Sequence, residues 1–333
     1  MIAVGCTAAR AVELCPAVAA FGAGIYVAGG KLALLLGVGN AVPNVTQLKV
    51  LLAYKLMARI QVTPRGNRHI FESFGLTPKL VVITTDEADP ASKVYMRNKQ
   101  KAAARIGIQY EEIILNKHAD QTIMLSTIRR LNADPTVHGI IVQLPLPARF
   151  DPLEIQETID PSKDVDGFHS KSSFDPCTPD AVIHMLHDEG FELDGKHAVV
   201  IGRSNIVGKP LARLLLLENA TVSVCHSHTD SILLERLCKE ADFVFCAAGF
   251  PGLVRPEMLA YGTVLVDISI NRDIEGKLCG DAHPDCYPLC SAYTPVPGGV
   301  GPLTVSRLMW HTVESAMRNH VEKVIDGVPS YLQ

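Results

Sequence analysis

Short apolar runs alternate with helical patterns along most of this chain, and this alternation restricts the possible folds more than any other feature. The first series of apolar runs occupies residues 80–84, 109–115 and 139–143. The second series occupies residues 197–202, 221–225, 243–247 and 263–268. Strands separated by helices in this way form parallel sheets with right-handed crossovers. The sequence therefore predicts an α/β protein.

The two series of strands predict two α/β domains with a linker near residues 170–179. The chain has 333 residues, 47% of them hydrophobic, which is enough for two cores of medium size. We expect an extension, a first domain that opens with a helix at residues 45–60, a second domain, and a C-terminal helix that returns to the first domain. These four parts occupy residues 1–44, 45–175, 176–302 and 303–333.

Charge and cysteine content exclude several classes of protein. A formal net charge of −4 and a pI near 6.3 provide no general attraction to nucleic acid or anionic lipid, so we expect neither as a partner. Nine cysteines scattered between Cys6 and Cys290 do not resemble the disulfide framework of a small secreted domain. The sequence therefore predicts a reducing compartment and a cytoplasmic location.

The N-terminal extension fits no simple template. Residues 11–42 are rich in Ala, Gly, Val and Leu, and Glu13 and Lys31 are their only charged residues. Repeated glycines weaken the interpretation as a membrane helix, and a single preceding arginine, Arg10, weakens that of a mitochondrial presequence. We expect an irregular extension, with a mitochondrial targeting segment and a membrane helix as the alternatives.

A glycine-containing turn, GRSNIVG at residues 202–208, joins a strand to a helix. Backbone N–H groups and the helix dipole favour a phosphate group there, although Ser204 as the N-cap of a plain turn would explain the same residues. The next strand ends at His226 and Ser227 without the acidic residue that is typical of NAD sites. Arg203 and Ser227 would hold a 2′-phosphate, which favours NADP, unless Arg203 is only a solvated surface residue. The second domain is therefore expected to be Rossmann-like.

Three residues with acid–base or hydroxyl groups share one face of the helix that follows the first strand. Ser92, Tyr95 and Lys99 are spaced by three and four residues. A lysine beside a phenol can exchange protons near neutrality, although on spacing alone an ordinary amphipathic helix with solvated lysines is the simpler interpretation. Gln143 ends a parallel strand, where open sheets place ligand contacts, and the loop KDVDG at residues 163–167 adds carboxylates whose alternative role is to cap turns.

The Tyr-x-x-x-Lys spacing also occurs in short-chain dehydrogenases. In that class the glycine-rich turn precedes the pair within one domain, whereas Gly202 here follows Lys99 by a long stretch of chain. We therefore reject that interpretation, and the order of the motifs predicts two domains that face one another.

Six motifs occur together in the order typical of one family. They are Ser92 with Tyr95 and Lys99, VQLPLP at residues 142–147, KDVDG at 163–167, PCTP at 176–179, GRSNIVG at 202–208 and TPVPGGVGP at 294–302. On these motifs, residues 70–325 resemble the methylenetetrahydrofolate dehydrogenase/cyclohydrolase family. The resemblance implies a homodimeric enzyme of one-carbon metabolism that serves purine biosynthesis. It would oxidise 5,10-methylenetetrahydrofolate to the methenyl form with NADP and hydrolyse that product to 10-formyltetrahydrofolate.

The resemblance also implies roles for individual residues. Lys99 would transfer protons, assisted by Tyr95 and Gln143, and Asp166 would bind the pterin ring. The other folate contacts implied are Ser92, Leu144, Pro145, Gly301, Pro302 and Val305. The NADP contacts implied are Thr178, Gly202, Arg203, Ser204, Ile206, His226, Ser227, Ile270 and Thr304.

The sequence departs from the family pattern in several places. The family's first strand is not recognisable before residue 45, the segment between His169 and Pro176 is short, and Ala181 and Ser269 stand where glycines are usual. A non-catalytic or single-activity folate- or nucleotide-binding protein is therefore the alternative function, although the retained catalytic residues favour an enzyme.

One cluster of potential metal ligands falls outside these motifs. Cys279, His283, Cys286 and Cys290 lie within a dozen residues, but they lack the paired Cys-x-x-Cys spacing of common zinc sites. The resembled family holds no metal here, and we expect none.

Overall fold

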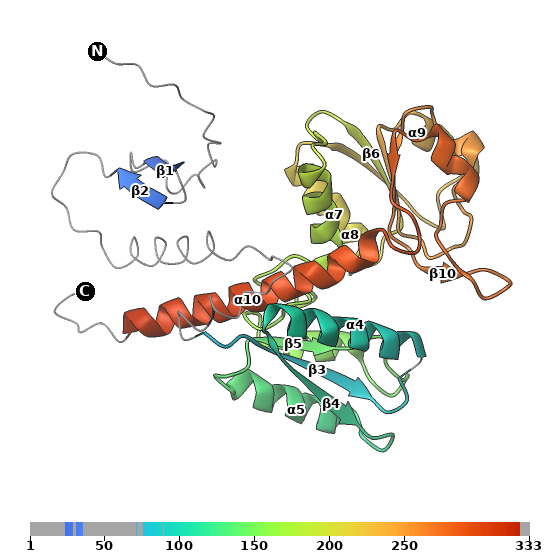
Figure 1. The fold of residues 1–333 in the computed structure, drawn as a ribbon. Coiled ribbons are helices and arrows are strands. Elements are labelled where there is room, and N and C mark those ends of the chain that lie inside the picture. The colour runs from blue at the N-terminus through green and yellow to red at the C-terminus, as the bar shows by residue number, and fades with distance from the viewer. Residues whose placement is uncertain (1–23, 29–30, 36–70, 72–75, 89, 327–333) are drawn as a thin grey trace, which may run out of the picture.

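The computed structural model describes residues 24–28, 31–35, 71, 76–88 and 90–326 (Figure 1). Within the predicted extension, β1 (Gly24–Ala28) and β2 (Lys31–Leu35) pair as an antiparallel hairpin. The helix predicted for residues 45–60 lies outside the described residues. No helix in the described part of the chain has the length and apolar character needed to span a membrane.

The first domain is built on a three-stranded parallel sheet in the order β4-β3-β5. Its elements are β3 (Lys79–Thr85), α4 (Pro90–Ile106), β4 (Gln109–Leu115), α5 (Gln121–Ala133), β5 (Gly139–Val142) and α6 (Pro152–Thr158). The central strand β3 is buried on both faces, as the apolar run predicts. Leu80 and Val82 belong to the core shared with α4, whereas Val81 and Ile83 belong to the core shared with α5 and α6.

Helix α5 begins where the sequence predicts. The Asp120 side chain accepts a hydrogen bond of 3.0 Å from the backbone N–H of Ile123, which satisfies one of the donors that every helix N-terminus leaves open. The helix continues to Ala133, two residues beyond its predicted end at Leu131. Helix α6 was not predicted, although Asp151 caps it in the same way and a proline occupies its first turn.

The second domain contains a five-stranded, fully parallel sheet in the order β12-β9-β8-β6-β7, which confirms the Rossmann-like architecture. Its main elements are α7 (Cys177–Asp188), β6 (His197–Ile201), α8 (Gly208–Leu217), β7 (Thr221–Cys225), α9 (Ser231–Lys239), β8 (Phe243–Cys246), β9 (Val264–Asp267) and β12 (Ala292–Tyr293). Shorter elements are η1 (Pro256–Met258), β10 (Asn271–Arg272), β11 (Leu278–Cys279) and η2 (Pro284–Leu289). The predicted linker is too long, because α7 begins within it at Cys177.

Strand order places the nucleotide turn at a favourable point of this sheet. Strand β7 pairs with one side of β6, and the chain then returns so that β8 pairs with the other side of β6. The direction in which strands are added to the sheet therefore reverses at β6. Ligands of open α/β sheets bind at the carboxyl ends of strands at such a switch point. Gly202 follows β6 directly with φ of 129°, and a Cβ there would lie 2.1 Å from the carbonyl oxygen of Ala247. Only glycine fits at this position, because the ends of β6 and β8 approach each other closely.

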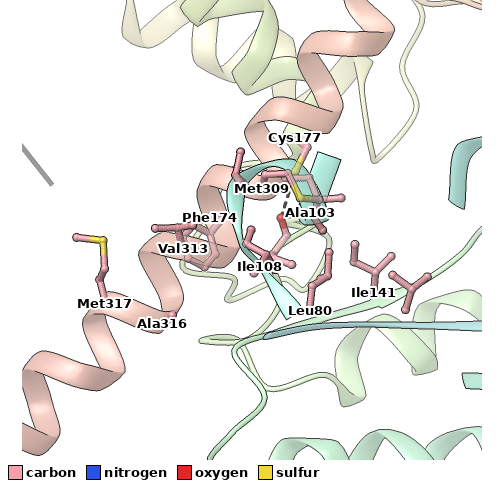
Figure 2. Packing of buried hydrophobic residues seen from close by; sticks show 14 of the residues in the cluster. Leu80, Ala103, Ile108, Ile141, Phe174, Cys177, Met309, Val313, Ala316 and Met317 are labelled. Carbon is pink, nitrogen blue, oxygen red and sulfur yellow. Dashed lines mark hydrogen bonds between the residues drawn. The ribbon is translucent and has the colours of Figure 1, made fainter. Parts of the chain in front are cut away.

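Helix α10 (Val300–Asp326) connects the two domains, as predicted for the C-terminal helix (Figure 1). Its first half packs against α7, and it continues along α4 and the sheet of the first domain. Met309 and Val313 on α10 join Leu80 and Ile141 of that sheet in one buried cluster (Figure 2). The helix is longer than the predicted span of residues 303–321 at both ends.

Candidate functional site

A cavity of about 480 Å³ lies where the two domains and the start of α10 meet. The first domain contributes α4, the end of β5 and the loop at residues 166–168, and the other wall contains the first turn of α7. The lining residues are Ser92, Tyr95, Lys99, Val142, Gln143, Leu144, Pro145, Asp166, Phe168, Cys177, Thr178, Ile206, Ile268, Ile270, Val300, Gly301, Thr304, Val305 and Leu308. The structure thus brings together most of the residues that sequence reasoning selected.

Lys99 and Gln143 form a direct polar pair in this cavity. The Lys99 ammonium donates a hydrogen bond of 3.1 Å to Oε1 of Gln143, and Gln143 in turn donates through Nε2 to the carbonyl oxygen of Leu144 at 2.7 Å. The amide orientation is therefore fixed by two partners, and its oxygen faces the lysine. A cationic group that can give or take protons stands at a defined place in the cavity wall.

Tyr95 and Ser92 lie on the same face of α4 as Lys99, as their spacing predicts. The Tyr95 side chain is 36% exposed, and partial burial raises the pKa of its phenol, which keeps the hydroxyl protonated at neutral pH. Ser92 is buried. The helix therefore presents a phenol and an ammonium to the cavity one turn apart.

Asp166 adds a carboxyl group to the lining of the same cavity. Burial raises its pKa, and the positive charges of Lys99 and His311 counteract that effect. Asp166 is partly buried, and its carboxylate accepts no hydrogen bond from any residue that the structure describes. Gly167, with φ of 77°, permits the tight passage of this loop, because a Cβ there would lie 2.5 Å from the backbone of Asp175. The carboxylate of Asp166 can therefore accept hydrogen bonds from the N–H groups of a polar ligand in the cavity.

The glycine turn after β6 is compact and held by Ser204. Its hydroxyl oxygen accepts hydrogen bonds from the backbone N–H groups of Val207, at 3.1 Å, and Gly208, at 3.3 Å. Helix α8 begins only at Gly208, so the interpretation of Ser204 as the helix N-cap is wrong. The physical reason is an extra turn at residues 204–207 that precedes the helix. The Ser204 hydroxyl closes this turn by its hydrogen bond from Val207.

Arg203 and Ser227 leave neighbouring strands at the same edge of the sheet. The parallel register pairs Ile201 with Cys225, so each of the two residues follows its strand by the same number of positions. Both side chains are exposed. A cation and a hydroxyl at adjacent strand ends can bind a phosphate monoester next to the glycine turn.

The remaining predicted cofactor residues divide into two groups. Thr178 and Thr304 join α7 to α10 through their hydroxyl oxygens, 3.1 Å apart, and both line the cavity with Ile206 and Ile270. Gly202, Arg203, Ser204, His226 and Ser227 lie along the ends of β6 and β7, outside the cavity lining. Among the predicted folate contacts, Pro302 is exposed and is not one of the lining residues.

A buried polar cluster behind the cavity was not predicted from sequence. It joins Cys177 and Asp180 of α7 to Arg307 and His311 of α10, residues more than 120 positions apart. Cys177 also lines the cavity. No local spacing indicates this arrangement, because its members lie on two helices that meet only in the folded chain.

Of the two residues that stand where the family usually has glycine, Ser269 makes new hydrogen bonds and Ala181 is buried in a helix. The Ser269 hydroxyl donates to the buried carboxylate of Asp281 at 2.7 Å and accepts from the backbone N–H of Gly249 at 3.2 Å. Ala181 is buried on α7 beside the second core. Ser269 therefore helps to hold the loop after β8, next to the switch point.

The cysteines near residue 286 form hydrogen bonds within the second domain. The Cys286 thiol donates to the carbonyl oxygen of Val254, and the Cys290 thiol donates to that of Cys286. Within the described ranges, no group of three or more His, Cys, Asp or Glu side chains is arranged to hold a metal ion.

Comparison with protein families places this geometry in context. Residues 52–166 match the model of the tetrahydrofolate dehydrogenase/cyclohydrolase catalytic domain, and residues 176–320 match that of the NAD(P)-binding domain of the same family. A bifunctional protein FolD of Magnetococcus marinus is 48% identical over 255 residues, covering 74% of this chain and 88% of the relative. The FolD protein of Streptococcus equi subsp. equi is 44% identical over 254 residues, covering 73% and 88% of the two chains.

Solved structures agree with these matches. The bifunctional enzyme FolD of Campylobacter jejuni, a methylenetetrahydrofolate dehydrogenase/cyclohydrolase, superposes with a TM-score of 0.72 at 39% identity, covering 82% of this chain and 97% of the other. The methylenetetrahydrofolate dehydrogenase-cyclohydrolase of Trypanosoma brucei, solved with NADP and an inhibitor, gives a TM-score of 0.70 at 32% identity. The match covers 84% of this chain and 97% of that one.

Proposed function

This chain belongs to the tetrahydrofolate dehydrogenase/cyclohydrolase family, and we propose that both reactions of a bifunctional member take place in the cavity between its two domains. The substrate is 5,10-methylenetetrahydrofolate, which is oxidised with NADP to the methenyl form, and water then converts that cation to 10-formyltetrahydrofolate. The observation that carries the proposal is the Lys99–Gln143 pair, 3.1 Å apart, in the same cavity as the carboxyl group of Asp166, which accepts no hydrogen bond from a described residue.

We assign Asp166 to recognition of the pterin ring. The aminopyrimidine part of a folate presents N–H donors, and the carboxylate of Asp166 lacks a protein donor among the described residues. Charge-assisted hydrogen bonds of this kind contribute about 1.5–3 kcal/mol each. Leu144, Pro145 and Val305 supply apolar surface on either side of the space into which the ring would fit.

The residues of the second domain fit NADP. Gly202 and Gly208 bring the backbone of the turn into close contact, since a Cβ on Gly208 would lie 2.3 Å from the carbonyl oxygen of Gly202. The N-terminus of α8 would face the pyrophosphate, with Arg203 and Ser227 at the 2′-phosphate and His226 beside the adenosine ribose. When bound, NADP supplies the acceptor for the hydride of the methylene carbon.

For the oxidation, this chain mainly has to position two planar rings. The first domain holds the folate against α4 and β5, and the facing wall consists of Thr178, Ile206 and Ile270 of the second domain and Thr304 of α10. Holding two reactants in a productive geometry converts a bimolecular step into an effectively unimolecular one. The cavity lies between the domains because each domain binds one of the two reactants.

For the hydrolysis, the chain has to move protons. Water attacks the methenyl carbon, loses a proton, and the departing ring nitrogen gains one as the carbon–nitrogen bond breaks. We assign these transfers to Lys99, whose ammonium group is oriented by Gln143 and lies one helical turn from the phenol of Tyr95. Tyr95 stays protonated and donates a hydrogen bond to the reacting group.

The proposal is tested on the purified full-length chain with two spectrophotometric assays. NADPH formation with 5,10-methylenetetrahydrofolate measures the oxidation, and the loss of methenyl absorbance measures the hydrolysis. We expect both activities, and a higher kcat/KM with NADP than with NAD. A protein that binds both ligands but catalyses neither step would contradict the proposal and support the non-catalytic alternative.

We also propose that the enzyme is a cytoplasmic homodimer, as the family resemblance implies. The seven described cysteines are all free, which fits the reducing compartment of this proposal. Light scattering coupled to size-exclusion chromatography should give twice the chain mass of 36.0 kDa. A monomer mass at micromolar concentration would contradict the dimer.

A further inference from the structure

The buried side chain of Asp281 holds the loop that follows β8. Its oxygen Oδ2 accepts hydrogen bonds from the backbone N–H groups of Ala248, at 2.7 Å, and Gly249, at 3.1 Å. Its other oxygen, Oδ1, accepts from the backbone N–H of Phe250 at 2.8 Å. Successive backbone N–H groups can together bind an anion, and here a side chain of the same domain takes that place. The loop at residues 248–250 is therefore fixed although it lies at the surface.

Asp281 itself is held in place by the main chain around it. Its carbonyl oxygen accepts a hydrogen bond of 3.0 Å from the backbone N–H of Val254, and the N–H of the next residue, Ala282, donates to Oδ2 of Asp267 at 2.8 Å. The residue before it, Gly280, packs so closely that a Cβ there would lie 2.0 Å from the same atom of Asp267. The carboxyl group of Asp281 is therefore a fixed point for the segments around it.

Ser269 connects the segment that follows β9 to this fixed point. Its hydroxyl donates to Oδ2 of Asp281 at 2.7 Å and accepts from the backbone N–H of Gly249 at 3.2 Å. Two residues later, Nδ2 of Asn271 donates to Oδ1 of Asp281 at 2.8 Å. The segments after β8 and β9 are thus joined both directly and through one carboxyl group. A glycine in place of Ser269, as is usual in the family, would make neither hydroxyl contact.

The joined segments border both parts of the proposed NADP site. On one side, Ile268 and Ile270 line the cavity, whereas Ser269 between them is not one of the lining residues. On the other side, Ala247 precedes the fixed loop, and its carbonyl oxygen is the atom that a Cβ on Gly202 would approach to 2.1 Å. A dinucleotide that binds at the glycine turn and reacts in the cavity has to pass these two segments. Ser269 therefore connects the cavity wall to the loop that contacts the turn.

We propose that Ser269 is a positioning residue for NADP, because with Asp281 it fixes Ile268 and Ile270 relative to the loop at residues 248–250. Segments that are already held in place do not have to be ordered when the ligand binds, so binding costs less conformational entropy. The inference rests on the proposed function, because NADP is the ligand that is positioned. It goes further by giving a role in cofactor binding to a residue at which this chain departs from its family.

The test compares NADP binding and both activities in wild type and in Ser269→Ala, which lacks the hydroxyl and its two hydrogen bonds. We expect the dissociation constant for NADP, from titration calorimetry, and the KM for NADP to rise about fivefold, the effect of one ordinary hydrogen bond. The cyclohydrolase rate, measured without NADP, should stay within about twofold, because that step needs no cofactor. Ser269→Thr keeps the hydroxyl and should retain the wild-type affinity.

Ser291→Ala is the matched control. Ser291 belongs to the same domain and directly precedes β12, and its hydroxyl donates to the carbonyl oxygen of Gly262 at 2.7 Å. Strands β9 and β12 are parallel, so Ser291 and Gly262 lie at the amino ends of these strands, opposite the edge that Ser269 occupies. Its replacement should leave the affinity for NADP unchanged. An equal loss in this variant would show that any such hydrogen bond of the domain matters, and would overturn the role of Ser269.

Ser269→Gly provides a second variant in case Ser269→Ala does not fold, because glycine is the usual residue in the family and also lacks the hydroxyl. An unchanged affinity for NADP in the folded variants would overturn the inference. An equal loss of NADP affinity and of cyclohydrolase rate would also overturn it, because it would indicate a general structural defect. A wild type without either activity would contradict the proposed function alone, and the NADP dissociation constants would still decide this inference.

Discussion

Replacement of Lys99 by Met separates the two reactions most sharply. Methionine keeps much of the apolar stem and removes the ammonium group, which lies 3.1 Å from Oε1 of Gln143. Gln143 retains its hydrogen bond of 2.7 Å to the carbonyl oxygen of Leu144, so the cavity wall should keep its shape. The variant therefore removes an acid–base group with little change in geometry.

The expected losses differ in size because the two steps differ in chemistry. A well-placed general acid–base group contributes about 10²–10⁴-fold, or roughly 2.7–5.5 kcal/mol of transition-state stabilisation, and this loss should fall on the cyclohydrolase step. Hydride transfer needs ring alignment, so the dehydrogenase kcat should fall about tenfold or less, the range of one ordinary hydrogen bond. An amide does not titrate, so Gln143 cannot replace the ammonium as the group that transfers protons.

The measurement follows NADPH formation and loss of methenyl absorbance in parallel, for wild type, Lys99→Met and Lys101→Met. Lys101 is an exposed lysine on the same helix and serves as the matched control, with both activities unchanged. Equal losses of the two activities in a folded Lys99→Met variant would refute the reasoning. Lys99 would then be a binding contact and not the proton-transfer group.

Three further predictions concern the cofactor and stability. Arg203→Ala should reduce the preference for NADP over NAD in kcat/KM by about tenfold or more, because one charged contact to the 2′-phosphate is lost; an unchanged ratio would contradict that contact. Gly208→Ala should abolish NADP binding in a titration calorimeter, since its Cβ would lie 2.3 Å from the carbonyl oxygen of Gly202, and wild-type affinity would show that the turn adapts freely. Burial raises the pKa of Asp267 to about 6, so the folded state binds this proton more tightly than the unfolded chain. The resulting stabilisation, about 3 kcal/mol, should be fully present below about pH 4 and lost as pH rises through 6, and urea unfolding of Asp267→Asn should lack that slope.

Local patterns in the sequence were sufficient for the strands and for several helix ends. Strands β4 and β7 coincide with their predicted ranges, because short apolar runs bounded by turn residues have few other conformations. The N-cap of α5 was visible for the same reason, since Asp120 acts on N–H groups within three residues. The face shared by Tyr95 and Lys99 also follows from helical spacing alone.

Long-range relations were not predictable in this way. Helix α7 begins at a cysteine inside the predicted linker, and no acid or hydroxyl residue caps it through its side chain. In sequence, His311 is an ordinary residue of a helix. Its place in the buried polar cluster depends on a contact with Asp180, a residue 131 positions away. The alternative interpretation of Ser204 as a helix cap is wrong, because its hydroxyl closes the turn that precedes α8. Such contacts depend on how helices of different domains meet, which local propensity does not encode.

The central claim is that one cavity binds the folate for both reactions, and Asp166→Asn tests it most directly. The measurement is the KM of the variant for 5,10-methylenetetrahydrofolate in the dehydrogenase assay and for the methenyl form in the cyclohydrolase assay. Because the same carboxylate would hold the pterin ring in both steps, both KM values should rise together by about 10–100-fold, the range expected for a hydrogen bond to a charged group. A rise in only one of the two KM values would contradict the account and indicate separate folate sites.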